Sequence, residues 1–460
     1  MAIKADVDHR DCENAMSDER LSIAIIEPIH YKLFLKLNME SENYDGESDI
    51  VIKIHKPTKR LSLHCFGSYI DTSSILLKSI TEALNPNTRY ASYRVCTKIQ
   101  RFDILYDDLI SPGLYELHIH FYGIYNKNEN IIRYQYMRYT ETEATRRWFL
   151  GILSTSNRAR TLFPCWDEPE IHMNYEIIIE HPEQYKVISN MPVQQLINKS
   201  DDTSLTYFHT SKPIASSQVA IIMVDNMTHS NLGDDLYWYQ RDIVKNTNIT
   251  LEILKTKELF KNYLGVHYRC IETDHIVIPY FPSQIRGSLG VIIYREESFK
   301  YDNATDFPGR KMYIYKYERD SSIMDLSIVQ TMQGALYYDV DFQMAPVSQN
   351  KFVHPIDEID AIYYSRPYYN KGAAIMRMLF YSLEAPEYVY KEIIRKLAKK
   401  CDNTTDSMSG LWAIVQSSLT NNDKLLYNIT EIMDTWMTKR HFPELKVDCD
   451  YNGILSRQLR

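Results

Sequence analysis

The sequence predicts an α+β protein in which an antiparallel β domain precedes a part that mixes strands and helices. Apolar and polar residues alternate with period two between about residues 20 and 225, which is typical of half-buried strands. Beyond that stretch, apolar residues recur at helical spacing. The chain has 460 residues, more than one hydrophobic core usually supports, so two domains are expected.

The expected organisation has four parts. Residues 1–20 form a polar N-terminal tail, and residues 21–225 form the β domain. Residues 226–445 form the mixed domain, and residues 446–460 are expected to begin a further small β domain that is cut short. No internal repeat and no low-complexity tract interrupts this order.

The β domain is predicted from short alternating runs. The clearest are Leu33–Leu37, Ile50–Ile54 and Leu117–Phe121, in which every second residue is apolar. The pieces Tyr44–Gly46 and Ser111–Gly113 carry turn-forming residues and are expected to separate strands. A domain of this kind is held together by pairing between neighbouring strands.

The remaining elements follow in order along the chain. The last strands of the β domain are expected at residues 175–180 and 219–224. The mixed domain is expected to hold a helix over residues 249–263, strands at 276–278 and 291–294, and helices at 372–383, 388–400 and 431–438.

Composition and charge exclude several classes of protein. Hydrophobic residues make up 44% of the chain and charged residues 24%, as in soluble globular domains. The 36 tyrosines against 14 glycines favour strand-rich architecture, although compositional drift explains them equally well. The formal charge of -8 provides no basic footprint for nucleic acid, so that partner is not expected.

Targeting signals are not evident in the sequence. No apolar run approaches the roughly 20 residues that span a bilayer, and the opening residues are too polar for a signal peptide. We therefore expect no membrane span and a cytoplasmic chain if it is translated as written. Six Asn-x-Ser/Thr triplets point instead toward a glycosylated ancestor, although such triplets also arise by chance: Asn198, Asn226, Asn248, Asn303, Asn403 and Asn428.

One ten-residue segment, Arg160–Pro169, reads Arg-Thr-Leu-Phe-Pro-Cys-Trp-Asp-Glu-Pro. It resembles the signature of zinc aminopeptidases of the aminopeptidase N (gluzincin) family. Further matches keep the order of that family and cover nearly the whole chain: Glu27–Tyr31, Ile188–Pro192, Tyr294–Glu296, Lys371–Leu379 and Ile432–Trp436. The resemblance implies a β-saddle domain followed by a thermolysin-like domain. Members of that family are peptidases that are often secreted or anchored in the plasma membrane.

The seven cysteines lack CxxC and metal-knuckle spacing, so neither a zinc ribbon nor a dense disulfide framework is expected. Cys165 lies inside the signature between Pro164 and Trp166, with no histidine near it in sequence. A packed, inert thiol is therefore the favoured interpretation of Cys165, because free cysteine commonly behaves as a small buried hydrophobe.

The zinc chemistry of that family needs two histidines one helical turn apart with a glutamate beside the first, the HExxH motif. The sequence holds 14 histidines, and no two of them are four residues apart. The closest pair, His118 and His120, is expected on one face of a strand in the β domain, where metal binding is disfavoured. The zinc-site segment is expected to be missing between Tyr301 and Asp320, so no metal is expected in this chain.

Three positions correspond to substrate-site residues of the family. Counting from Tyr294–Glu296, the glutamate that anchors the substrate amine is replaced by Gly287, with Arg286 beside it, and a second anchor is replaced by Thr155. Tyr369 matches the tyrosine that stabilises the oxyanion, although Tyr364 or Tyr368 competes for that role. Tyr369 is therefore a relict at most.

Two interpretations remain open. The chain is either a pseudoenzyme whose cleft would take a peptide, or the partial product of a locus that encodes an active zinc aminopeptidase removing N-terminal residues from peptides. The changes at the amine anchors favour the first. A serine hydrolase is disfavoured because the sequence has no GxSxG motif, and the sequence does not set the oligomeric state.

Overall fold

The computed structural model describes most of residues 21–239 and 272–296 and several segments beyond them. The gaps within the first two ranges are residues 22, 81–86, 126–130, 140–143, 154–158, 169, 200, 226, 233–234 and 284. The other described residues are 258, 262, 332–341, 346–347, 366–382, 391–396, 408–419, 428–439, 445–449 and 455–459. The predicted helix over residues 249–263 lies almost entirely outside the described residues.

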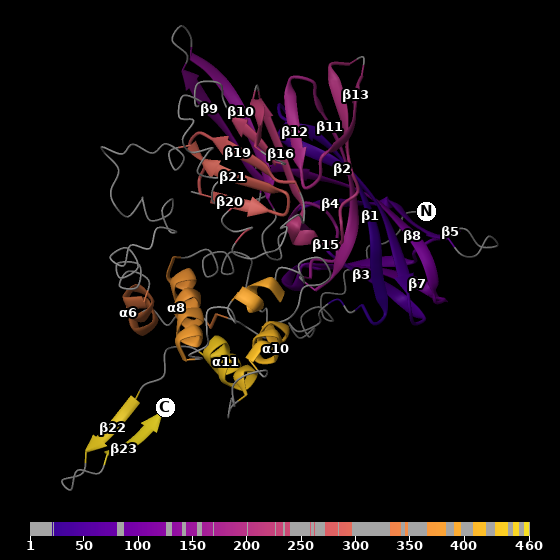
Figure 1. Cartoon of the computed structure of the whole chain (residues 1–460). Helices are drawn as coiled ribbons and strands as arrows, with labels where there is room; N and C mark the ends of the chain where they lie inside the picture. The colour runs from indigo at the N-terminus through magenta and orange to yellow at the C-terminus, as the bar shows by residue number, and fades with distance from the viewer. Residues whose placement is uncertain are drawn as a thin grey trace. The chain divides into compact units, whose positions relative to one another are not determined.

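The chain divides into two compact units (Figure 1). The first contains residues 1–261, 267–302 and 402–405, and the second contains residues 262–266, 303–401 and 406–460. The described residues are mostly in β-sheets with few helices, as the predicted β domain requires. The four-part division expected from the sequence stays a prediction.

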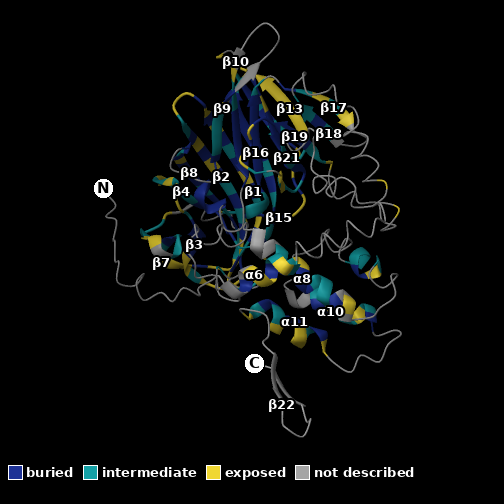
Figure 2. Cartoon of the chain, turned by 90° about the vertical axis from the view of Figure 1, so that its left-hand side faces the viewer, coloured by how far each residue is buried: buried dark blue, intermediate teal, exposed yellow. Residues whose placement is uncertain are grey.

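The largest sheet of the first unit has nine strands among the described residues, in the order β13-β14-β11-β1-β2-β8-β4-β5, with β15 beside β11. These strands are β1 (Ile26–Asn38), β2 (Asn43–Ile54), β4 (Tyr69–Ser79), β5 (Asn87–Thr88), β8 (Gly113–Ile124), β11 (His172–Pro182), β13 (Val193–Asn198), β14 (Thr203–Phe208) and β15 (Ile214–Ala215). Every second residue is buried in β2, in β8 and in β1 from Tyr31 onward, so the predicted alternation is confirmed there (Figure 2). In β1 a register shift between Pro28 and His30 changes the phase.

Three smaller sheets complete the first unit. A three-stranded sheet has the order β3 (Thr58–His64), β7 (Arg101–Ile110), β6 (Ser92–Cys96). A four-stranded sheet has the order β12 (Tyr185–Ser189), β16 (Ala220–Asp225), β10 (Ala144–Leu153), β9 (Ile131–Tyr139). A five-stranded sheet has the order β17 (Thr228–Leu232), β18 (Asp235–Tyr239), β19 (Asp274–Ile278), β21 (Val291–Arg295), β20 (Ile285–Ser288). Among the described residues, three short 3-10 helices connect strands: Thr97–Ile99, Ala159–Thr161 and Ser216–Gln218.

The four-stranded sheet is the middle layer of the first unit. One of its faces, with Leu150 and Ile221, joins the core of the nine-stranded sheet. The other face, with Phe149 and Ile222, packs against Ile276 of the five-stranded sheet. A sheet buried on both faces consists of near-continuous apolar runs, and all five residues from Ala220 to Val224 are indeed buried.

Two predictions about the β domain are wrong in detail. The domain is not wholly antiparallel, because β1 and β11 pair in parallel, which a long connection between strands distant in sequence permits. Tyr44–Gly46 is not a turn but lies inside β2, and the chain turns at residues 39–42 instead. Gly46 faces Phe121 across the sheet, and a Cβ at Gly46 would lie 2.4 Å from the ring, so this glycine makes room for an aromatic side chain.

The described helices belong to the second unit: α6 (Gly334–Asp341), α8 (Arg366–Ser382), α10 (Met408–Leu419) and α11 (Ile429–Thr438). Residues 391–396 are also helical, within the predicted helix over 388–400. Trp412 and Met433 are buried in a core that α8, α10 and α11 share with Ile393. A hairpin of β22 (Leu445–Cys449) and β23 (Leu455–Leu459) follows at residues where one strand was predicted.

Candidate functional site

Strand β20 forms one edge of the five-stranded sheet and contains the expected amine-anchor position. It pairs with β21 on one side only among the described strands, through a two-residue loop, Leu289-Gly290, in which Gly290 has a φ of 78°. Gly287 is exposed, and a Cβ at this position would meet its nearest atoms, on Ile292 and Val291, at 3.5 Å. The position is open on its outer side and could hold a side chain.

Asn190 ties this hairpin to the middle sheet. Its buried side chain donates from Nδ2 to the carbonyl oxygens of Leu289 (2.7 Å) and Gln218 (2.8 Å). Its Oδ1 accepts from the backbone N–H of Ala220 at 2.8 Å. The hydroxyl of Ser288 also donates to the Gln218 carbonyl. A single carboxamide therefore satisfies three backbone groups and holds the loop that follows β20 against the middle sheet.

Polar side chains also lie on the face of the five-stranded sheet that is turned away from the middle sheet. His275 Nδ1 and the Tyr294 hydroxyl are joined by a hydrogen bond of 2.9 Å, and the two rings stack with centroids 5.8 Å apart. Burial raises the pKa of Tyr294 to about 12. The pKa of Tyr237 is also raised, mainly by burial and to a lesser extent by the neighbouring Tyr294. These phenols therefore stay protonated near neutral pH and serve as hydrogen-bonding groups.

At the start of β19, Asp274 accepts a hydrogen bond from Trp238 Nε1 at 2.7 Å. Burial raises the pKa of the Asp274 carboxyl to about 6, which the Trp238 bond partly opposes. The indole ring of Trp238 also contacts His229, with centroids 4.6 Å apart. The sequence analysis did not single out Asp274 or His275, because their neighbours come from strands far apart in the chain.

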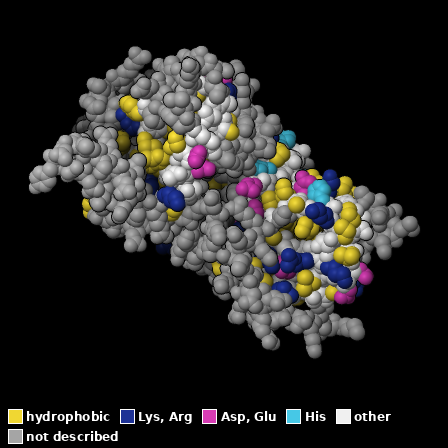
Figure 3. Space-filling view, turned by 90° about the horizontal axis from the view of Figure 1, so that it is seen from below, with side chains coloured by type: hydrophobic (Ala, Val, Ile, Leu, Met, Phe, Trp, Pro, Cys, Tyr) yellow, Lys and Arg dark blue, Asp and Glu magenta, His cyan; other side chains and the backbone are white. Residues whose placement is uncertain are grey.

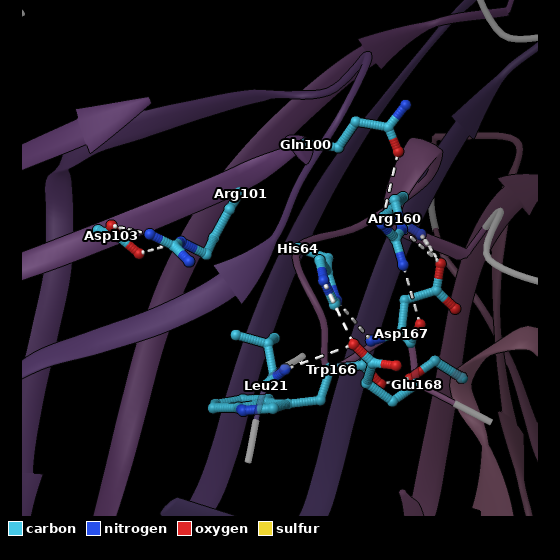
Figure 4. A network of polar contacts seen from close by, with 10 residues as sticks. Leu21, His64, Gln100, Arg101, Asp103, Arg160, Trp166, Asp167 and Glu168 are labelled. Atoms are coloured by element: carbon cyan, nitrogen blue, oxygen red, sulfur yellow. Dashed lines mark hydrogen bonds and ion pairs between the residues drawn. The ribbon is translucent and has the colours of Figure 1, made fainter. Parts of the chain in front are cut away.

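The signature segment is buried in the β domain and binds its own acidic pair (Figure 4). Asp167 accepts from Arg160 Nε at 2.9 Å and from the Arg160 backbone N–H at 3.2 Å, while Arg160 also donates to the Asp167 carbonyl at 2.9 Å. The backbone N–H of Asp167 donates to His64 Nδ1 at 3.2 Å, and Glu168 lies 3.7 Å from His64 Nε2. Both carboxylates therefore serve the fold at this place.

His64 is held neutral by this environment. Burial is the largest cause that keeps its pKa well below the ordinary histidine value, and the positive charges of Arg160 and Arg101 add to it. Because Nδ1 accepts a hydrogen bond, the ring proton lies on Nε2, on the side of Glu168. His64 is thus a structural acceptor and not a free base.

Two tyrosines donate to the signature segment directly, and a third reaches it through a serine hydroxyl. The hydroxyl of Tyr31 donates to the Pro164 carbonyl, and that of Tyr44 donates to the Leu162 carbonyl at 2.8 Å. Tyr175 donates to Ser216, which in turn donates to the Trp166 carbonyl at 2.9 Å. These three tyrosines are almost fully buried, so part of the high tyrosine content serves the interior of the domain and not sheet surfaces.

The prediction for Cys165 is confirmed. Its side chain is fully buried, and burial raises the pKa of the thiol well above its ordinary value. Backbone hydrogen bonds join Cys165 and His64 in both directions, at 2.8 and 3.0 Å. A buried, protonated thiol is a poor nucleophile.

Of the three predicted site residues, the structure describes the surroundings of Gly287 alone. Gly287 lies in β20, as described above. Tyr369 lies inside α8, which begins at Arg366 and not at Gly372, and its side chain is outside the described part of the chain. Thr155 also falls outside the described residues.

Within the described residues, no group of three or more His, Cys, Asp or Glu side chains is placed to hold a metal ion. His118 and His120 each face a carboxylate on a neighbouring strand, Asp49 at 2.7 Å and Asp71 at 4.0 Å.

In the described part of the chain, no helix is both long and apolar enough to cross a membrane. On the face shown in Figure 3, basic and acidic side chains lie interspersed among hydrophobic ones.

Comparison with known proteins identifies the β domain. Residues 27–217 match the peptidase M1 N-terminal domain. The chain is a homologue of the M1 aminopeptidases. It is 26% identical to the glutamyl aminopeptidase of Bos taurus over 480 residues and 25% identical to that of Homo sapiens over 484 residues. The matches cover 92% and 93% of this chain and 48% of each relative, so the chain spans about half the length of these relatives.

A second kind of M1 relative matches a shorter stretch. The endoplasmic reticulum aminopeptidase 1 of Rattus norvegicus is 24% identical over 295 residues, which cover 63% of this chain and 31% of the relative. The predicted resemblance is therefore confirmed at the level of the M1 aminopeptidases. M1 aminopeptidases are zinc enzymes, and no metal site is shown among the described residues of this chain.

Proposed function

We propose that this chain is a pseudoenzyme of the M1 aminopeptidases, with the zinc chemistry lost and a sheet edge that binds an extended peptide. The observation that carries the proposal is the histidine spacing: none of the 14 histidines stands four residues from another. A zinc helix of the HExxH kind needs that spacing, because only then do both imidazoles reach one metal. We further propose that the zinc-site segment of a thermolysin-like domain is missing between Tyr301 and Asp320.

Among the residues that the structure describes, the donors do not fit the zinc that M1 aminopeptidases use. His118 and His120 lie in the β domain, and their partners come from separate strands, Asp49 on β2 and Asp71 on β4. His64 accepts a backbone hydrogen bond, and His275 is bonded to a phenol.

The amine-anchor position supports the loss of exopeptidase chemistry. An α-ammonium group is bound best by a carboxylate that accepts a charge-assisted hydrogen bond. The corresponding position is Gly287, which has no side chain, and its neighbour is Arg286. A free peptide N-terminus would therefore meet no anchoring charge at this position.

The backbone of β20 supports peptide binding. In a hairpin with a two-residue loop, the flanking residues Ser288 and Val291 form a hydrogen-bonded pair, and the pattern then alternates along the strand. The backbone N–H and C=O groups of Arg286 therefore point toward β21, and those of Gly287 and Ile285 point toward the open edge. An extended peptide can add to such an edge as a further strand.

Metal content and turnover test the loss of activity. We expect the purified full chain to hold no stoichiometric zinc and to hydrolyse no aminoacyl arylamide, with an active glutamyl aminopeptidase as the positive control. About one tightly bound zinc per chain, with turnover that a chelator abolishes, would refute the proposal and favour an active peptidase. The genomic sequence between the codons for Tyr301 and Asp320 separates the two interpretations independently, because an intact HExxH exon there would support the partial-product interpretation.

Peptide binding is tested with a matched pair of variants. Gly287→Pro removes the outward N–H from the edge strand, whereas Gly287→Ala keeps it and adds a Cβ that makes only ordinary contacts. In a fluorescence-anisotropy titration with labelled random extended peptides, we expect binding to the parent chain and to Gly287→Ala and a loss of at least about tenfold in affinity with Gly287→Pro. Equal binding to both variants would place the peptide elsewhere, and no binding to any of them would refute the peptide site.

A further inference from the structure

Strand β13 is an exposed edge of the nine-stranded sheet. It pairs with β14 on one side, and no strand pairs with its other side among the described residues. All six residues from Val193 to Asn198 are exposed, including Leu196 at 51% and Ile197 at 39%. A strand with apolar side chains and a free edge invites pairing with another chain.

The open backbone groups of this edge can be assigned. The N–H of Lys199 donates to the Thr203 carbonyl at 2.8 Å, so Lys199 and Thr203 form a bonded pair with β14. Because bonded positions alternate along an antiparallel ladder, the N–H and C=O groups of Asn198 and Leu196 point away from β14. Two consecutive outward positions are enough to begin a ladder with a second strand.

Only the first half of β13 contains features that commonly prevent an edge strand from pairing with another chain, such as a proline or a bulge. Pro192 precedes the strand, and a register shift between Val193 and Gln195 disrupts the ladder there. The charge that follows the strand belongs to Lys199, whose ammonium is bound to Glu180. The second half, Leu196-Ile197-Asn198, contains neither proline nor charge.

Asn198 is also the first residue of the triplet Asn198-Lys199-Ser200. Its carboxamide is exposed, with Oδ1 accepting from the Ser204 hydroxyl at 3.0 Å and Nδ2 donating to Glu183 at 3.2 Å. An amide nitrogen that carries a sugar keeps one hydrogen, so one donated hydrogen bond can remain. We propose that Asn198 carries an N-linked oligosaccharide that covers the unguarded half of the β13 edge.

The modification is a group transfer with a defined donor. Nδ2 of Asn198 attacks the anomeric carbon of an oligosaccharide linked to a lipid pyrophosphate. A C–N bond forms, the C–O bond to the pyrophosphate breaks, and the lipid pyrophosphate leaves with the electron pair. One proton is lost from Nδ2, so the amide ends with a single hydrogen. The Ser or Thr in the third place of the triplet directs this transfer to surface asparagines in exported chains, and the second residue can be any except proline.

A second triplet within the described residues serves as an internal control. Asn428 begins Asn428-Ile429-Thr430 and is the N-cap of α11, where its Oδ1 accepts from the Thr430 N–H at 3.0 Å. Asn428 therefore lies at the end of a helix and not on a strand. The removal of a sugar at Asn428 should therefore leave the behaviour of the β13 edge unchanged.

Site occupancy is measured on the full 460-residue chain expressed behind a cleavable signal peptide in a eukaryotic cell line. The chain is purified from cells and medium together, because the sugar is attached whether or not the protein is later released. Enzymatic deglycosylation in heavy-oxygen water followed by peptide mass spectrometry labels each occupied asparagine. We expect the label at Asn198, and its complete loss in Asn198→Gln and in Ser200→Ala but not in Asn428→Gln. An unlabelled Asn198 in a chain whose signal peptide has been cleaved would overturn the proposal.

The covering role is tested by association state. We expect Asn198→Gln to shift from monomer to dimers and larger species in gel filtration with light scattering, and Asn428→Gln to elute like the parent. Adding Leu196→Lys to Asn198→Gln should restore the parent elution, because a charge at the open edge replaces the cover. If Asn198→Gln elutes like the parent while the parent is glycosylated, the sugar does not cover the edge. If Leu196→Lys fails to reverse the shift, association uses another surface.

Discussion

Replacement of Asn190 should release the β20–β21 hairpin from the middle sheet. Asn190→Ala removes two donors and one acceptor, each within 2.8 Å of its partner. The Gln218 carbonyl keeps the Ser288 hydroxyl, so the groups left unsatisfied are the Leu289 carbonyl and the Ala220 N–H. At about 1–3 kcal/mol for each buried orphan, the free energy of unfolding should fall by about 3 kcal/mol.

Two readouts test this estimate. Urea unfolding of the full chain measures the loss against Gln194→Ala, which truncates an exposed carboxamide on β13 and should cost less than about 0.5 kcal/mol. Hydrogen exchange followed by mass spectrometry should show faster exchange in peptides that cover residues 285–295 and 218–222. Because the two units can unfold separately, this local readout identifies the first unit as the part affected.

The isosteric variant sharpens the test. Asn190→Asp keeps an acceptor for the Ala220 N–H but turns an oxygen toward the carbonyls of Leu289 and Gln218, so it should destabilise at least as much as alanine. A change below about 0.5 kcal/mol in both variants, with hydrogen exchange unaltered, would refute the anchoring role. Loss of peptide binding in Asn190→Ala with retained folding would instead connect the anchor to the proposed edge site.

Three further predictions concern charges. The native state excludes a proton from His64, so the free energy of unfolding should fall as pH drops below about 6.5, by up to about 1.4 kcal/mol per pH unit. His64→Gln should flatten this pH dependence, measured by urea unfolding at pH values between 5 and 7. Lys371 and Asp339 form a buried ion pair of 2.5 Å between α8 and α6, so Lys371→Met should cost about 3–5 kcal/mol in thermal unfolding. The double variant Lys371→Met with Asp339→Asn should lose less than the sum of the two single variants, and a loss equal to that sum would show no coupling. Gly287→Glu should fold with a change below about 0.5 kcal/mol, prefer peptides with a free amine over acetylated ones, and gain no turnover, so hydrolysis by this variant would contradict the proposed loss of zinc chemistry.

Period-two alternation predicted the strands of the β domain but not how they pair. The same holds for the strands at residues 276–278 and 291–294, which were predicted in the mixed domain: both are confirmed, yet their parallel pairing depends on a connection that periodicity does not describe. Gly46 suggested a turn because glycine is common in turns, whereas here it makes room for Phe121 from another strand. Such errors arise where the role of a residue is set by a contact with a residue distant in sequence.

Local signals were also insufficient at the helix that carries Tyr369. The sequence predicted a start at Gly372, but α8 begins six residues earlier at Arg366, with Pro367 in its first turn. Proline is tolerated there because the first N–H groups of a helix have no partner within it. The ion pair of Lys371 could not be predicted either, since Asp339 lies 32 residues away.

The structure explains why the signature survives in a chain with no HExxH spacing. Arg160 and Asp167 bind each other, Glu168 faces His64, and Cys165 is buried, so the signature serves the packing of the β domain. Tyrosines from β1 and β2 donate to its carbonyls, which would be costly to leave unsatisfied in the core. A loss of catalysis, as we propose for this chain, would leave these requirements unchanged. A match to this signature therefore identifies the M1 β domain, and activity has to be argued from the zinc helix and the amine anchors.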